Sequence, residues 1–195
     1  MCQRCAWATA TELEQQYHDQ VWGVPQTDDR QLFEYLILES AQAGLSWRTI
    51  LEKRSGYSRQ YEGFDPEVVA GFDQSKIEQM LLDPGIVRNR LKVASSVRTA
   101  AAFLELAAKH GSFAHFIWQF VDGRPLQNRW KTLNEVPAET EQSKAMSEAL
   151  KQAGMKFVGP TICYAYMQAT GMVNDHEMSC HRYAPCRELG ETFSL

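Results

Sequence analysis

Two cysteines and two histidines stand near the ends of the chain, as Cys5 and His18 at one end and His176 and Cys180 at the other. Twelve residues separate Cys5 from His18, a common inner spacing in zinc sites. His176 and Cys180 are four positions apart, which would bring their side chains together on one helical turn. Because two thiolates and two imidazoles form a closed tetrahedral site, the pattern predicts a structural metal ion that joins the termini.

The remaining cysteines and histidines leave alternatives open. Cys2 and Cys5 resemble half of an all-cysteine site, and His181 and Cys186 lie close to Cys180 in the sequence. The five cysteines could also be scattered small hydrophobic residues, some of them buried. A metal between the two ends would close a very long loop, which could contribute several kcal/mol to stability.

One acidic residue is expected on an otherwise apolar helix face. Asp28 can cap a helix, Gln31 is placed for a capping box, and Gly44 is a stop signal, so the sequence predicts a helix over residues 28–44. Glu39 shares a stripe of this helix with apolar residues. A carboxylate at such a position is either half of a structural ion pair or a group that acts on a ligand.

The rest of the chain is also predicted to be helical, because good helix formers dominate and no segment alternates apolar and polar residues. Start and stop signals predict further helices at about 47–54, after Asp65-Pro66, from Ser75, up to Lys109, and over 112–121, 140–154 and 159–171. Residues 122–138 are predicted to be irregular. Roughly eight or nine helices, most too short to be stable alone, must pack together. We therefore expect a single all-α domain, a compact helical bundle spanning residues 1–195.

The composition is ordinary for a soluble globular protein, with 44% hydrophobic and 23% charged residues. No apolar run could cross a bilayer and the first residues lack a signal-peptide core, so we expect a cytoplasmic protein with no membrane partner. The net charge of −4 argues mildly against a polyanionic partner, although binding requires only a local basic stripe. One candidate stripe, which could equally be a solvated helix face, comprises Arg88, Arg90, Lys92 and Arg98.

Several long motifs follow one another along the chain. The N-terminal motifs are Arg4-Cys5-Ala6-Trp7, Tyr17-His18-Asp19 and Trp22-Gly23-Val24-Pro25. The central motif is Leu38-Glu39-Ser40-Ala41-Gln42-Ala43-Gly44-Leu45-Ser46-Trp47. The C-terminal motifs are Lys156-Phe157-Val158-Gly159-Pro160-Thr161-Ile162-Cys163-Tyr164 and Val173-Asn174-Asp175-His176. With these motifs, residues 4 to about 181 resemble the bacterial DNA-3-methyladenine glycosylase I family, which belongs to the helix-hairpin-helix DNA glycosylase superfamily.

The resemblance implies an all-α fold of the helix-hairpin-helix glycosylase type. Two helical lobes would flank a base pocket, and the terminal segments 1–25 and 172–186 would be joined by zinc. In this family two cysteines and two histidines at the chain ends hold one structural zinc ion, and the matching positions are the four residues named first above. The resemblance thereby selects among the rival ligands and leaves Cys2, His181 and Cys186 as surface residues.

The implied activity is base-excision repair, the removal of 3-methyladenine and, as a further candidate, 3-methylguanine. An enzyme that acts on a base inside duplex DNA must first rotate that base out of the stack. The implied partners are double-stranded DNA with alkylated bases and the free methylated base as product, for a monomeric enzyme. No lysine can be assigned as a Schiff-base nucleophile, so we expect hydrolysis by water without strand cleavage.

The family match also assigns the residues of the pocket. Glu39 matches the base-recognising carboxylate and is the candidate catalytic residue, Trp47 matches the stacking ring, and Tyr17 and Trp22 match other walls. Methylation at N3 gives adenine a positive charge and weakens its glycosidic bond, so electron-rich rings and a buried carboxylate suit such a base. Without the match, core packing would be the commoner role of each tryptophan.

Two further segments match the parts that engage DNA. Gly44 permits a tight turn, Leu45 just past it is the candidate wedge, and Gln42 is the candidate support for the unpaired strand. The helix-hairpin-helix match places Gly159 and Thr161 at the tip that holds a phosphate.

Two positions remain open. Asp175 lies in the general region of the superfamily's catalytic aspartate, or it supports the zinc site through its neighbour His176. Glu14 stands where the family often has tyrosine, which puts one contact at the pocket edge in doubt. The competing hypotheses are a catalytically silent DNA-binding relative and a zinc-stabilised helical interaction module with no role on nucleic acid.

Overall fold

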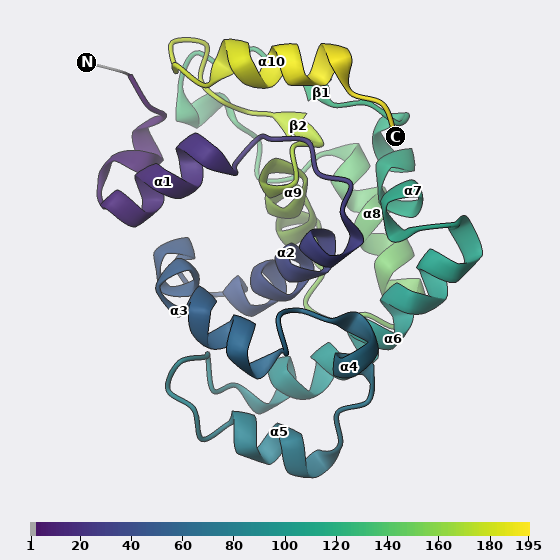
Figure 1. Cartoon of the computed structure of the whole chain (residues 1–195). Coiled ribbons are helices and arrows are strands. Elements are labelled where there is room, and N and C mark those ends of the chain that lie inside the picture. Colours follow the sequence, from purple (N-terminus) through teal and green to yellow (C-terminus); the bar gives the residue numbers. More distant parts are fainter. Residues whose placement is uncertain (1–2) are drawn as a thin grey trace.

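Ten α-helices account for most of residues 3–195, the part of the chain that the computed structural model describes (Figure 1). In chain order they are α1 (Glu12–Gln20), α2 (Asp29–Gln42), α3 (Trp47–Gln60), α4 (Pro66–Ala70), α5 (Gln74–Met80), α6 (Arg90–His110), α7 (Phe113–Trp118), α8 (Glu141–Gln152), α9 (Pro160–Ala169) and α10 (Tyr183–Thr192). Between them lie the 3-10 helices η1 (Ala6–Thr9), η2 (Gln119–Val121) and η3 (Leu133–Glu135), and the strands β1 (Leu126–Gln127) and β2 (Val173–Asn174). The predicted all-α fold is confirmed.

The central helices begin at the side-chain caps that the sequence indicates. Asp28 accepts a hydrogen bond from the backbone N–H of Gln31 at the start of α2, and Ser46 accepts one from Thr49 at the start of α3. The capping box predicted for α2 is not closed by Gln31, because the amide oxygen of Gln26 accepts from the backbone N–H of Asp28 instead.

Two helix boundaries differ from the prediction for identifiable reasons. Helix α3 continues past residue 54 to Gln60 through Gly56, where a Cβ atom would lie only 2.1 Å from the carbonyl oxygen of Gly85. This glycine serves a close backbone approach rather than a helix stop. Helix α5 begins after Asp73 instead of Ser75, since the Asp73 carboxylate accepts from the first turn.

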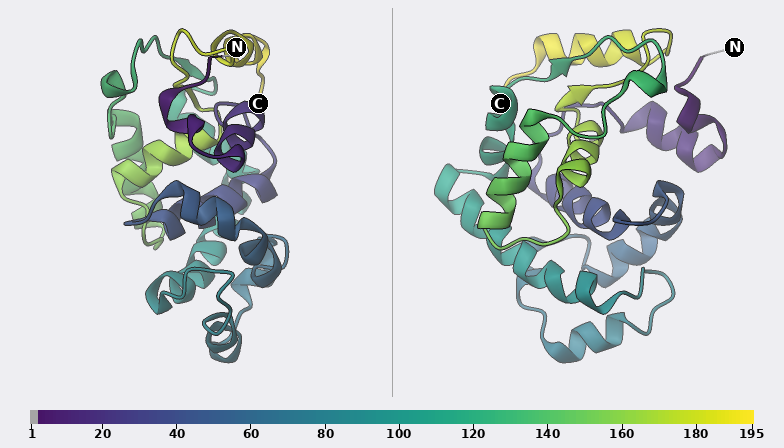
Figure 2. Two further views of the ribbon diagram at one scale, coloured as in Figure 1. Left: turned by 90° about the vertical axis from the view of Figure 1, so that its left-hand side faces the viewer. Right: turned by 180° about the vertical axis from the view of Figure 1, so that it is seen from behind.

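Helix α2 crosses the middle of the molecule and packs against α3, α6, α7 and α9 (Figure 1). Its buried residues extend around more than one face, as expected for a helix enclosed by others. Helices α4 and α5 lie at one end of the molecule, and α10, the two strands and the N-terminal segment lie at the other (Figure 2). No helix among residues 3–195 has both the length and the hydrophobicity needed to traverse a bilayer.

Two short strands join segments that are distant in sequence. β1 pairs in parallel with β2, with Leu126 opposite Val173 and Gln127 opposite Asn174. Strands of two residues are too short to produce an alternating sequence pattern, and the sequence analysis missed them. It also missed α10, which packs against both strands. The predicted irregular segment 122–138 is otherwise built of turns and η3.

Candidate active site and metal centre

A cavity of about 270 Å³ opens between α1, α2, α3 and α9. This volume is close to the lower end for ligand pockets, roughly 300 Å³. All four residues predicted to bind the base line it: Tyr17, Trp22, Glu39 and Trp47. The other lining residues are Cys5, Trp7, Gln42, Leu133, Val136, Ala165, Gln168, Asp175 and Glu177. Trp7 was not among the residues predicted to bind the base, although its place in the first motif was a usable signal.

Glu39 places a carboxyl group in the wall of this cavity. It projects from the buried face of α2 and is 3% exposed. No residue within 3–195 forms a hydrogen bond or an ion pair with it. Burial therefore raises the pKa of Glu39 to about 8. A structural ion pair, the alternative raised by its sequence position, is not present among the described residues.

Aromatic rings form much of the remaining wall. The ring centroids of Trp7 and Trp22 are 5.1 Å apart in an edge-to-face arrangement, and those of Tyr17 and Trp47 are 5.2 Å apart. The indole Nε1 of Trp47 is buried and has no hydrogen-bond partner among residues 3–195. The cavity thus combines aromatic walls with one unpaired carboxyl group, a combination suited to a flat, cationic ring.

Glu14, the departure from the family pattern, does not line the cavity. Its carboxylate lies 3.1 Å from the guanidinium of Arg48 and accepts a hydrogen bond from the hydroxyl of Thr11. The pair ties α1, which carries Tyr17, to α3, which carries Trp47. The position where the family often has tyrosine is therefore used here for an ion pair that lies outside the cavity.

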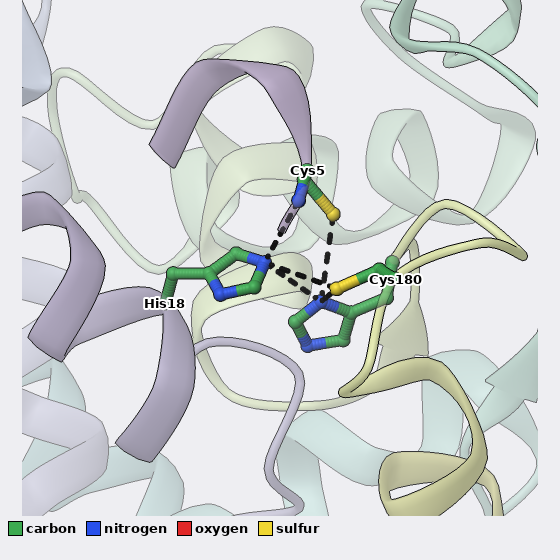
Figure 3. Close-up of side chains that lie close together, drawn as sticks. Cys5, His18 and Cys180 are labelled. Atoms are coloured by element: carbon green, nitrogen blue, oxygen red, sulfur yellow. Dashed lines mark hydrogen bonds between the residues drawn. The ribbon is translucent and has the colours of Figure 1, made fainter. Parts of the chain in front are cut away.

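The four predicted metal ligands converge from the two chain ends (Figure 3). Their ligand atoms all lie within 4.8 Å of one another and all four residues are buried. His176 Nδ1 is 3.6 Å from the Sγ atoms of both Cys5 and Cys180 and 3.2 Å from His18 Nε2. The pKa of the Cys180 thiol is lowered chiefly because the Cys5 thiol can donate to its sulfur. A thiolate is the form that binds a metal, and the group could hold one ion.

The outward nitrogens of both histidines have acceptors that fix the ring orientation. His18 Nδ1 is 2.8 Å from a carboxylate oxygen of Asp19, which also forms an ion pair with Arg4. His176 Nε2 is 3.0 Å from the backbone carbonyl of Trp22. If these outer nitrogens carry the protons, the inner nitrogens are left free to ligate a metal.

Two details of the predicted metal centre were wrong, and one of the two roles left open for Asp175 has no hydrogen bond to support it. His176 and Cys180 lie in a loop with a turn rather than on one helical turn. Asp175 does not bond to His176, and Asp19 takes the supporting position on the other histidine. Cys186 is buried, at 1% exposure, and is not a surface residue. Its sulfur accepts a hydrogen bond from Arg182. The spacing of the cysteines in the sequence could not reveal this burial.

Of the other two rival ligands, His181 also stands outside the cluster. His181 is partly exposed and contacts the backbone carbonyl of Gln3 and the carboxylate of Asp19. Cys2 lies outside the described residues.

Asp175 forms a dense hydrogen-bond network in the cavity wall. One carboxylate oxygen accepts from Asn128 at 2.6 Å and from the indole of Trp130 at 2.7 Å. The other accepts from the hydroxyl of Tyr164 at 2.6 Å and from the amide of Gln168 at 2.8 Å. All four donors are neutral. Asp175 therefore joins the 128–130 loop to α9 and fixes this side of the cavity.

The turn after α2 is closed by its own residues. The backbone N–H of Leu45 donates to the carbonyl of Gln42 at 2.7 Å, and the Gln42 amide donates to the carbonyl of Leu45 at 3.0 Å. Gly44 has φ +80°, in the left-handed region, and no atom within 4 Å of an added Cβ. Leu45 is 39% exposed, so an apolar side chain stands free on a tight turn.

The predicted hairpin precedes α9. Gly159 is the residue before the first turn of α9, Pro160 begins it, and Thr161 is exposed. The carbonyl of Val158 accepts from Ser147 on α8 at 2.6 Å, which anchors the hairpin to the preceding helix. Space is open around Gly159, where a Cβ atom would meet nothing within 4 Å.

The basic stripe is only partly available to a ligand. Arg90 pairs with Glu78, and Arg98 pairs with Glu105 while donating to the carbonyl of Ala153. Lys92 donates to two backbone carbonyls, so intramolecular partners occupy three of the four cations.

An all-helical bundle, an aromatic cavity with an unpaired buried carboxyl group, an exposed apolar turn and a helical hairpin occur together here. They define the class of helix-hairpin-helix DNA glycosylases, enzymes that work on a base taken out of the duplex.

The chain belongs to the methyladenine glycosylase family, whose sequence model matches residues 7–183. It is 44% identical to DNA-3-methyladenine glycosylase 1 of Escherichia coli (strain K12), over 93% of this chain and 97% of the relative. A crystal structure of 3-methyladenine DNA glycosylase I has a TM-score of 0.89 and 45% identity, covering 92% of this chain and 98% of that one. A crystal structure of a variant of 3-methyladenine DNA glycosylase I in complex with 3-methyladenine has a TM-score of 0.89 and 34% identity, covering 91% of this chain and 96% of that one.

Replacing Glu39 by glutamine should change how stability depends on pH. The pKa of Glu39 is raised from 4.5 to about 8 in the fold, so the folded protein keeps a proton that the unfolded chain releases. The stability that this proton contributes is fully present below pH 4.5 and is lost as pH rises through 8. The E39Q variant is neutral throughout. We expect it to match the wild type near pH 5 and to exceed it by at least about 1 kcal/mol at pH 8.5, measured by urea unfolding. The exposed control E148Q should show no such pH-dependent gain, and equal behaviour of both variants would contradict the assignment.

Replacing Asp175 by asparagine should weaken the cavity wall. An amide nitrogen would face two of the four donors, leaving buried donors unsatisfied at a cost of about 2–3 kcal/mol. Chemical denaturation of D175N and of the exposed control D122N measures the difference. Equal stability of the two variants would show that the network does not depend on the carboxylate.

Proposed function

We propose that this chain is a DNA repair glycosylase that hydrolyses the N-glycosidic bond of 3-methyladenine in alkylated double-stranded DNA. The observation that carries the proposal is Glu39, a buried carboxyl group inside an aromatic cavity, with no hydrogen-bond or ion-pair partner among residues 3–195. Membership of the methyladenine glycosylase family and a similar structure that holds 3-methyladenine support it. Selectivity for adenine over guanine bases would be set in this cavity.

Glu39 and the aromatic walls suit a base that carries positive charge. A cation entering the cavity favours the ionised form of Glu39, and the carboxylate can accept a hydrogen bond from the exocyclic amine. Trp47 would stack on the base, while Tyr17 and Trp22 would complete the walls. Uncharged adenine gains none of this electrostatic attraction. Glu39 therefore acts where the substrate and the undamaged base differ most.

The cleavage step makes modest demands on the protein. N3 methylation already makes the base a good leaving group, so a water molecule attacks the anomeric carbon as the glycosidic bond breaks. The bonding electrons leave with the base and neutralise its charge, and the attacking water loses a proton to solvent, which leaves a hydroxyl group on the sugar. No lysine lines the cavity among the described residues, in keeping with hydrolysis that leaves the strand intact.

The turn and the hairpin would engage the DNA around the lesion. Leu45 would fill the gap left by the rotated base, with Gln42 beside it and Gly44 allowing a close approach. The backbone N–H groups near Gly159 and Thr161 would hold a phosphate at the start of α9. We propose that residues 1–195 form one domain, that two helical lobes flank the cavity, and that the enzyme acts as a monomer on DNA in the cytoplasm.

The ion that suits the buried ligand group is zinc. Ligand atoms at zinc–nitrogen and zinc–sulfur bond lengths lie roughly 3.3–3.8 Å apart in a tetrahedral site. The separations of 3.2, 3.4 and 3.6 Å between His176 Nδ1, His18 Nε2 and the two sulfurs come close to these values. One structural zinc ion would then link residues 1–25 to residues 172–186.

The decisive experiment for the activity is a base-release assay with product identification. We expect the wild type to release 3-methyladenine from methylated duplex DNA and to leave the abasic strand uncut until alkali is added. E39Q should be slower by about 10- to 100-fold, the value of a hydrogen bond to a charged group. No release by folded, metal-loaded protein would instead favour a silent DNA-binding relative, and enzyme-dependent nicking would exclude the hydrolytic mechanism.

Zinc content distinguishes the ligand set from its neighbours. Elemental analysis should find about one zinc per chain in the wild type and in C186S, and less in C180S. Chelation should cost on the order of 3 kcal/mol, a fall of about 6–12 °C in the melting midpoint. A C180S variant that keeps a full complement of zinc would exclude this site.

A further inference from the structure

Lys92 occupies an unusual place at the start of α6. It lies in the first turn of this helix, where the backbone N–H of Lys92 donates to the side chain of the capping residue Asn89. A cation in the first turn is disfavoured by the dipole of its own helix. Some interaction outside α6 must therefore account for its orientation.

The ammonium of Lys92 reaches the end of α2 instead. Its Nζ atom donates to the backbone carbonyl of Ala41 at 2.7 Å and to that of Ala43 at 2.5 Å. Carbonyls at a helix C-terminus have no partners within the helix and carry partial negative charge. The lysine from α6 thus supplies the C-terminal cap that α2 does not make for itself.

These two carbonyls flank the exposed turn. Gln42 lies between Ala41 and Ala43, and Gly44 and Leu45 follow directly. Among the described residues, the turn is otherwise closed only by the two bonds between Gln42 and Leu45. Because Gly44 has no neighbour within 4 Å of an added Cβ, packing on that side does not restrain it. The hydrogen bonds from Lys92 are therefore the main restraint on the turn from outside it.

The same ammonium also faces the hairpin before α9. Lys92 Nζ lies 5.9 Å from the ring centroid of Phe157, near the outer limit of a cation–π contact. Phe157 has φ +58°, which is uncommon for a non-glycine residue, and it stands two positions before Gly159. Lys92 thus lies between the two segments that would meet the DNA.

We propose that Lys92 is a positioning residue that fixes the 42–45 turn, and with it the Leu45 wedge, relative to the hairpin at 157–161. The inference rests on the proposed function, because it assigns the turn a role in DNA. It differs from a phosphate contact, since both hydrogen bonds of Lys92 are made within the protein. A misplaced wedge would slow base rotation while leaving Glu39 and the aromatic walls of the cavity in place.

The test compares K92M, which keeps the aliphatic stem, with K92R and with the charge-matched control K109M on the exposed end of α6. Single-turnover excision from methylated duplex DNA at saturating enzyme should be about tenfold slower for K92M at both low and high salt. Affinity for free 3-methyladenine, followed by tryptophan fluorescence, should stay within about twofold of wild type. K92R should recover at least half of the wild-type rate, and K109M should be unaffected.

Three results would overturn the proposal. The first is a K92M rate equal to that of K109M. The second is a wild-type rate at saturating enzyme combined with weaker binding to duplex DNA. If the slope of log binding constant against log salt concentration is also smaller in magnitude by about one, the result identifies a phosphate contact. The third is a parallel loss of free-base affinity, which identifies a general collapse at the end of α2. If K92M does not fold, K92Q should show a smaller defect of the same kind, and a wild-type rate for K92Q would overturn the proposal. Absence of base release by the wild type would refute the proposed function instead.

Discussion

A carboxylic acid held out of water without a partner is the constraint on which the site depends. Desolvation disfavours the charge on Glu39, and nothing among the described residues offsets that cost. Such a group is tolerated only where the surrounding packing is strong enough to hold it. Helix α2 meets this demand by lying at the centre of the bundle, enclosed by α3, α6, α7 and α9. A cationic base in the cavity would offset this cost, which is how the proposed function accounts for selectivity.

The buried ligand cluster and the cavity share a wall. Cys5 belongs to both, and the ring of Trp22 lies edge-to-face against His176 at 4.7 Å while its carbonyl accepts from the same imidazole. An ion held by the four ligands would therefore stabilise the aromatic side of the cavity as well as the chain ends. The Glu14–Arg48 pair and the Asp175 network restrain the other sides. Each wall of the cavity is thus anchored by a different kind of interaction.

Local signals in the sequence were sufficient for most of the fold. Caps such as Asp28 and Ser46 act within one helical turn, so they can be recognised from neighbouring residues alone. The ligand set and the pocket residues followed from motifs, and the structure brings each group together. The β1–β2 pairing, the burial of Cys186 and the four donors around Asp175 depend on contacts between distant segments. Spacing carries no information about such contacts.

The separation of the ligands along the chain has a consequence for biosynthesis. His18 leaves the ribosome 158 residues before His176, an interval of roughly ten to thirty seconds at ordinary elongation rates. During that interval the N-terminal pair can form only half of the ligand cluster, and the wall that contains Trp22 lacks its imidazole neighbour. We expect the nascent chain to acquire a base-binding cavity only when translation is nearly complete. A polypeptide terminated before His176 would therefore lack a complete cavity and could not hold a rotated base.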